Sequence, residues 1–383
     1  MARAFSHSGR RASGLRGRGS ILVVVLVSLV FATAALVLFV RKAGTDLLVE
    51  VREADAQRLR IEAYSAMETV LTVLDEFRRA NDGLRSPRQG WDDPFQWCDY
   101  QPAEGYAVSV TFTDESGRIS LPQTDFVTLT NLFERWEVPE LEAERWADAL
   151  LGWMKRDYTP KSITGAQPED YERAPLPFKP PGRSLRSWDE LRSIDVIREA
   201  FFDEQGRPND YARRFKEAVS LLDYKQLNVN AAPPDALGAL VGYDDHQLRQ
   251  LGDYFGGTGA YASGSRGYFD TTDEIKTVLG DEAATNGFGV QIRALRVSVT
   301  VRQGRSSFGL TAVVAPPGGA TAVPVGDIPE PEGTTASGSQ STPATSSTGE
   351  EAPASLNYPF TILEITENDV GSNPPPTDPP ELP

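Results

Sequence analysis

Side chains that could carry out catalysis or bind a metal are few in this sequence. Cys98 is the one cysteine, so the chain can form no internal disulfide and no zinc site built on several thiolates. The two histidines are His7 and His246, and a catalytic triad would depend on the second of them. A hydrolase could instead use acids such as Asp157 with Glu169, but no motif supplies a nucleophile, a base and an oxyanion donor together. We therefore predict that the protein is not an enzyme, with a hydrolase as the alternative.

The charges are unevenly distributed along the chain. The formal net charge is -16, yet residues 1–19 contain five arginines and no acid, whereas no Lys or Arg follows Arg305. Phosphate binding depends on Lys and Arg, so nucleic-acid binding by the acidic body is not expected. A basic start and an acidic body are typical of a chain that is divided by a membrane.

An uncharged apolar segment, residues 20–40, follows the basic start directly. At about 1.5 Å per residue, a helix of this length spans the hydrocarbon layer of a bilayer. The segment is longer than the apolar region of an ordinary signal peptide, and no clear A-x-A cleavage site follows it, so we predict a retained anchor. The excess of arginines before the segment, compared with Arg41 and Lys42 after it, predicts a cytoplasmic N-terminus and an exported body.

The rest of the chain predicts a sheet interrupted by an insertion. Apolar residues at three- and four-residue steps from Asp46 to about Phe77 indicate an amphipathic helix that continues the anchor. Asn81-Asp82-Gly83 and Pro87 are expected to end this helix. Alternation over residues 106–112 followed by 118–121 predicts one hairpin, and alternation over 294–302 followed by 307–314 predicts another.

The insertion between these strands is predicted to be mainly helical. Its expected helices cover residues 126–136, 139–155, 187–195, 211–222, 234–241, 245–255 and 272–279. Beyond Ala315 the sequence is rich in Pro, Gly, Ser, Thr and acids, which predicts disorder. One apolar island, residues 358–365, could form a strand on the sheet edge or a transient cluster.

Several motifs together resemble the type II secretion system protein K family. These motifs are Arg16-Gly17-Arg18-Gly19 before Ser20, Ser116-Gly117-Arg118-Ile119-Ser120-Leu121, residues 149–157 with Gly165-Ala166, Ser187-Trp188-Asp189-Glu190, and Leu227-Asn228-Val229-Asn230-Ala231-Ala232-Pro233. The likeness extends over about residues 12–315. It implies an α+β fold in which a long pilin-like N-terminal helix, first transmembrane and then amphipathic, packs on an antiparallel sheet, with a large helical domain inserted between strands.

The resulting domain prediction has six parts. They are a cleaved cytoplasmic leader (1–19), a transmembrane helix (20–40), a pilin-like helix and first strands (41–124), an inserted helical domain (125–289), the last strands of the pilin-like domain (290–315) and a disordered acidic tail (316–383). In the family, a prepilin peptidase cuts after the glycine and methylates the new amine. The resemblance therefore implies cleavage between Gly19 and Ser20, and N-methylation of Ser20.

The resemblance also implies a function and partners. Most pilins have a glutamate at the fifth mature position, whereas Val24 stands there in this sequence. In pilins that glutamate pairs with the N-terminal amine of the preceding subunit, so a chain without it is suited to be the first subunit. The resemblance implies a minor pseudopilin that forms the pseudopilus tip with minor pseudopilins I and J, starts assembly, and meets the secretin or the exported substrates.

The family's calcium binding is the one implied cofactor property. Gly152, Lys155, Tyr158 and Gln167 occupy places where the family usually has acids. Calcium takes about six to eight oxygen ligands, usually with more than one carboxylate. We therefore predict no resident cofactor. The alternative is calcium at Asp157, Glu169 and Asp170, which otherwise are acids of solvated turns.

Two further interpretations share part of the pattern. A minor pilin of a type IV pilus or a competence system would have the same leader and long helix. The segment Leu227 to Pro233 before a helix also resembles a helix-hairpin-helix DNA-binding module, but Asp244 and Asp245 stand near the place where such a module binds phosphate and would repel it.

Overall fold

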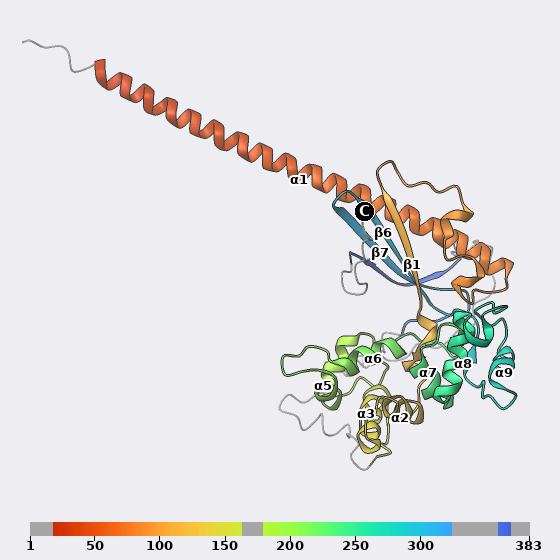
Figure 1. Cartoon of the computed structure of the whole chain (residues 1–383). Helices are drawn as coiled ribbons and strands as arrows, with labels where there is room; N and C mark the ends of the chain where they lie inside the picture. The colour runs from red at the N-terminus through yellow and green to blue at the C-terminus, as the bar shows by residue number, and fades with distance from the viewer. Residues whose placement is uncertain (1–17, 163–178, 324–358, 369–383) are drawn as a thin grey trace, which may run out of the picture. The chain divides into compact units, whose positions relative to one another are not determined.

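The computed structural model describes residues 18–162, 179–323 and 359–368. The chain divides into two compact units, residues 1–60 and residues 61–383, and the long helix α1 (Arg18–Ala80) contributes to both. The architecture is α+β, as predicted (Figure 1). In the second unit a four-stranded sheet carries a helical insertion between its first two strands in the sequence.

The predicted membrane helix and the predicted amphipathic helix form one continuous helix. Residues 22–40 are exposed apolar side chains or small residues, whereas the part after Ile61 buries a stripe at three- and four-residue steps, including Ala63, Ala66, Val70 and Leu74. The helix ends where the sequence predicted. Asn81 donates its backbone N–H to the Phe77 carbonyl, and the next two residues take the left-handed conformation.

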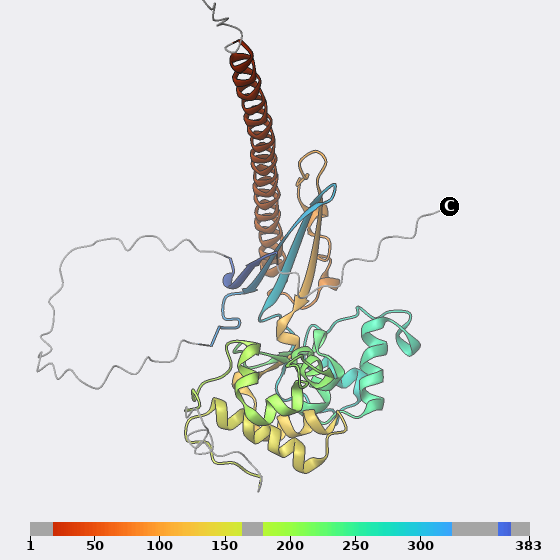
Figure 2. The ribbon, with the colours of Figure 1, turned by 90° about the vertical axis from the view of Figure 1, so that its left-hand side faces the viewer.

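The main sheet has the strand order β1-β6-β7-β8 and is antiparallel throughout (Figure 2). Its strands are β1 (Ala107–Asp114), β6 (Leu295–Gln303), β7 (Ser306–Ala315) and β8 (Thr361–Glu367). The predicted hairpin of β6 and β7 is confirmed, with Gly304 at positive φ in its turn. Alternate residues of β6 and β7 are fully buried on one face, which gives the sheet its apolar side.

The other predicted hairpin is wrong. β1 does not fold back on residues 118–121 but pairs along its whole length with β6, from Ala107 opposite Arg302 to Asp114 opposite Leu295. The chain then makes a 3-10 turn, η3 (Glu115–Gly117), and leaves the sheet. The error has a physical cause, because alternation fixes which face of a strand is buried but does not fix its partner.

The insertion is mainly helical, with two short parallel strand pairs at its base. The pairs join β2 (Ile119–Ser120) to β3 (Val219–Ser220) and β4 (Leu227–Asn228) to β5 (Phe288–Gly289). The α-helices are α2 (Phe126–Glu134), α3 (Glu140–Met154), α5 (Asp195–Phe201), α6 (Asp210–Ala218), α7 (Pro234–Val241), α8 (Asp245–Gly256) and α9 (Glu274–Leu279). The 3-10 helices are η1 (Pro87–Gln89), η2 (Pro94–Trp97), η3, η4 (Leu121–Gln123), η5 (Trp188–Ser193), η6 (Val229–Ala231) and η7 (Gly259–Tyr261), of which the first two precede β1.

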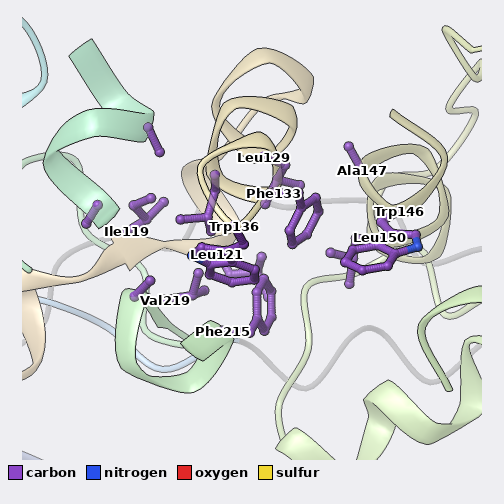
Figure 3. Packing of buried hydrophobic residues seen from close by; sticks show 14 of the residues in the cluster. Ile119, Leu121, Leu129, Phe133, Trp136, Trp146, Ala147, Leu150, Phe215 and Val219 are labelled. Carbon is purple, nitrogen blue, oxygen red and sulfur yellow. The ribbon is translucent and has the colours of Figure 1, made fainter. Parts of the chain in front are cut away.

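Aromatic side chains fill the core of the insertion. Phe133 of α2 is fully buried and lies within 5.3 to 6.3 Å, ring centre to ring centre, of Trp146, Phe201 and Phe215. Figure 3 shows Phe133 and Trp146 directed toward a shared interior from two neighbouring helices. Such ring contacts stabilise a core beyond the burial of apolar area alone. The insertion therefore has a hydrophobic core of its own.

Three sequence expectations need correction here. Residues 187–195 form the 3-10 helix η5 rather than an α-helix, and α5 directly after it was not predicted. The helix expected over 211–222 ends at Ala218, because the chain must extend to pair as β3. The tail after residue 316 is not structureless throughout, since its apolar island forms β8, the fourth strand of the sheet.

Candidate functional site

The N-terminal stretch of α1 holds the residues predicted to matter for processing and assembly. Gly19 and Ser20 lie in the first turn of this helix, which begins at Arg18. Val24 follows one turn later and is 61% exposed. In the described part of the chain, α1 is the one helix long and apolar enough to cross a membrane, with a mean hydropathy of 3.0 in its apolar window.

The lack of a carboxylate in this segment lowers the free energy needed to place the helix in a bilayer. An acid at the centre of a membrane helix costs about 2.5 to 3.5 kcal/mol on insertion scales unless it finds a partner. Residues 20–40 contain no acid and no base, and Val24 replaces the one acid that pilins usually keep there. The helix can therefore lie in the bilayer without an ion-pair partner.

Two of the family motifs come together at the neck, the place where the insertion leaves and rejoins the sheet. The loop after β1 and the segment from β4 to η6 meet there, although more than 100 residues separate them in the sequence. The buried Asn228 side chain donates to the Asp114 carboxylate at 2.6 Å and to the Arg85 carbonyl at 3.0 Å. Arg293, on the returning chain, donates its backbone N–H to the Ser116 hydroxyl at 2.8 Å. One amide and one hydroxyl thus hold four separate segments together.

Gly117 makes this close packing possible. A Cβ atom built on Gly117 would lie 2.6 Å from the Ala231 carbonyl oxygen and 2.7 Å from its carbon, both backbone atoms. Backbone atoms cannot move aside as a flexible side chain can, so only glycine fits. The motif that contains Gly117 and the motif that contains Asn228 therefore pack directly against each other in the neck.

Asp114 has an unusual environment in the neck. The residue as a whole is half-buried, but its carboxyl group is enclosed and accepts hydrogen bonds from the Ser116 backbone and hydroxyl and from Asn228. Burial raises the pKa of this carboxyl from 3.8 to about 6, and the hydrogen bonds from Ser116 and Asn228 oppose that rise. Asp114 therefore titrates in a range where most carboxyl groups are already ionised.

A second acid in the neck is paired with two arginines. Glu115 is nearly fully buried, and its two oxygens accept from Arg118 and from Arg296, each at 2.7 Å. These three side chains line a cleft of about 260 Å³, to which Arg186 and Glu364 also contribute. The cleft is smaller than most pockets for small molecules, which measure about 300 to 1,000 Å³. It contains no set of nucleophile and base of the kind that a hydrolase requires.

The region weighed as a calcium site has a different organisation. Asp157 is exposed, at φ +56° just after α3, and Glu169 and Asp170 lie outside the described residues. Sequence reasoning missed the fully buried Asp148, whose carboxylate accepts from the Tyr158 hydroxyl and from the backbone N–H groups of Lys161 and Ser162. The Ser162 hydroxyl also donates to it, at 2.6 Å.

Donors of the protein thus surround the buried Asp148 carboxylate. Burial raises the pKa of the Tyr158 hydroxyl, and its hydrogen bond to Asp148 raises it further, so the phenol remains a donor. Tyr158 is one of the residues found where the family usually has acids. Within the described ranges, no group of three or more His, Cys, Asp and Glu side chains could hold a metal ion.

A known protein family matches part of the chain. Residues 115–205 match the family model described as type II secretion system (T2SS), protein K. This part of the chain is therefore similar to protein K of the type II secretion system. The matched stretch starts at the neck and covers the first half of the insertion, the part that distinguishes this chain from a simple pilin-like helix and sheet. The likeness agrees with a membrane-anchored chain, because α1 is long and apolar enough to cross a membrane.

A solved structure has the same fold. The crystal structure of the GspK-GspI-GspJ complex from the enterotoxigenic Escherichia coli type 2 secretion system matches with a TM-score of 0.50 and 14% sequence identity. The match covers 83% of this chain and 98% of the solved chain. No curated protein sequence matches this chain. The fold is thus retained at a level of identity where individual side chains differ widely.

We predict that Gly117→Ala destabilises the protein by about 1 to 3 kcal/mol, because the new methyl group would overlap backbone atoms of Ala231. Urea unfolding of the full-length protein in detergent would measure the change. Gly252→Ala in α8 is the matched control, because a Cβ there meets nothing within 4 Å, and it should be neutral or stabilising by up to about 1 kcal/mol. Equal effects of the two substitutions would contradict the close-packing argument.

We also predict a pH dependence from Asp114. A carboxyl group whose pKa is raised on folding contributes stability below its unfolded value of 3.8, and that contribution is lost as the pH rises through about 6. Compared with Asp114→Asn, the wild type should lose up to about 3 kcal/mol of unfolding free energy between pH 4 and pH 7. Urea unfolding at several pH values would measure this difference. Asp189→Asn, at an exposed position, should show no such trend; a flat difference for Asp114→Asn would disprove the assignment.

Proposed function

We propose that this protein forms the tip of a type II secretion pseudopilus and starts its assembly. The observation that carries the proposal is the uncharged membrane segment of α1, with Val24 in place of the usual acid, on a chain of the protein K fold. A subunit without that carboxylate needs no amine from a preceding subunit. It can therefore occupy the first position, where no preceding subunit exists.

The same proposal covers processing and topology. A prepilin peptidase would cut between Gly19 and Ser20 and methylate Ser20, leaving α1 as the single span. The arginines of residues 1–19 favour a cytoplasmic leader and a periplasmic body, so the protein would lie in the inner membrane. The junction lies in the first turn of α1, at the start of the uncharged segment.

The partners would be other pseudopilins. The solved structure with the same fold is a complex of GspK with GspI and GspJ. By analogy, minor pseudopilins I and J would join this chain at the tip, and the insertion would face the secretin and the substrates that are exported across the outer membrane. The proposal includes no calcium ion, and the aromatic core of the insertion and the Asp148 network support it.

Processing can be tested directly by mass spectrometry of the protein purified from cells with an active prepilin peptidase. The mature chain should begin at N-methylated Ser20. Gly19→Leu should abolish the cut, because the residue at the cleavage site changes, whereas Gly17→Leu, two residues upstream, should leave it intact. An intact Met1 on the wild-type chain would contradict the proposal at its first step.

The tip position can be tested at Val24. Val24→Glu places a carboxylate in the bilayer without a partner, at a cost of about 2.5 to 3.5 kcal/mol, whereas Val24→Leu keeps the segment apolar. We expect the glutamate variant to impair secretion of a substrate, measured in the culture medium, clearly more than the leucine variant does. Equal secretion by both variants would overturn the tip argument.

A further inference from the structure

The fourth strand extends the sheet beyond the reach of the helix that covers it. Neighbouring strands lie about 4.8 Å apart, whereas a helix with its side chains is about 10 to 12 Å across. One helix therefore covers two or three strands, but not four. Accordingly, the inner residues of β6 and β7, such as Val299 and Leu310, are fully buried, whereas Ile362 and Ile365 of β8 are each 45% exposed.

The two isoleucines point to the same side of the sheet as α1. Ile365 lies opposite Ala312 and Ile362 opposite Val314, and both of these β7 residues are buried on the inner face. Farther along β8, Glu367 lies opposite Leu310 and accepts a hydrogen bond from the Tyr64 hydroxyl of α1 at 2.7 Å. We call this apolar part of β8, Ile362 and Ile365, the overhang.

The register also identifies which part of α1 borders the overhang. α1 ends near the start of β6, where the Leu84 carbonyl accepts from Ile292, so the helix runs antiparallel to β8. Two residues of strand and four residues of helix each advance about 6 to 7 Å. Since Tyr64 meets Glu367, the exposed Glu68 stands level with Ile365.

The other flank of the sheet differs. There the edge strand β1 is covered by aromatic side chains of the loop after α1, as Trp91 packs edge-to-face on Phe112 at 5.0 Å. Among the described residues, no equivalent cover lies on the overhang. Moreover Glu367 lies on the same face of β8, two residues beyond Ile365, and β8 has no basic residue, so one end of the apolar strip is acidic.

We propose that the overhang is a docking surface for the amphipathic helix of another pseudopilin, with an apolar stripe that covers Ile362 and Ile365 and a basic flank that faces Glu68. This inference rests on the proposed function and names the surface through which the subunits would associate. A second helix beside α1, at the usual spacing of about 8 to 10 Å, would lie over β8. The C-terminal tail then has a role in assembly, because it supplies the strand on which the partner lies.

The test is copurification of the full chain with coexpressed minor pseudopilins from detergent-solubilised membranes. Ile365→Lys should lower partner recovery at least tenfold, because it places a cation among apolar groups and next to the partner's basic flank. Glu364→Lys is the matched control: it introduces the same side chain at the adjacent position but on the opposite face of β8, and recovery should stay within twofold of the wild type. Equal thermal unfolding of both variants and the wild type would show that β8 remains in place.

A photo-cross-linker at position 365 identifies the occupant. A cross-link to the helix of a minor pseudopilin supports the proposal. A cross-link within the same chain, or to a second copy of it, overturns it, as does full partner recovery with Ile365→Lys. If the wild-type chain itself recovers no pseudopilin, the proposed function fails; if the wild type and Ile365→Lys recover it equally, only the docking surface fails.

Discussion

The structure depends on the closure of a long insertion at a single point of the sheet. Asp114, the last residue of β1, lies opposite Leu295, the first residue of β6, and the Glu115 N–H donates to the Ala294 carbonyl at 3.0 Å directly beyond that pair. Everything between residues 115 and 294 must therefore leave and return within one strand spacing. The helical domain can be large because the sheet requires only that its two ends meet.

Such a neck brings polar backbone groups out of water, and they need partners. Asn228, Ser116 and Tyr224 provide them: the Tyr224 hydroxyl lies 2.8 Å from the Glu115 carbonyl and 2.7 Å from the Arg118 carbonyl. Burial raises the pKa of Tyr224 well above its ordinary value, so the phenol keeps its proton. The motifs that contain Ser116 and Asn228 thus supply residues that hold the insertion on the sheet.

The two parts of α1 have sequences suited to different environments. In the membrane segment of α1 the backbone satisfies its own hydrogen bonds, and side-chain choice is limited mainly by the absence of charge. In the second unit, the same helix must bury one stripe on a sheet, and small residues such as Ala63 and Ala66 allow close approach. A pilin-like subunit needs both properties in one helix, because anchoring and folding share it.

The sequence by itself determined the long apolar segment of α1, the end of α1 near Asn81, the hairpin of β6 and β7 and most helices of the insertion. These features follow from local composition, periodicity and turn residues, which act within a few residues of one another. Only the tertiary structure decided the partner of β1, the role of Gly117 against Ala231, the burial of Asp148 and the place of β8 in the sheet. Each of these features depends on contact between segments that are distant in the sequence. No local sequence pattern specifies which segment will be the partner.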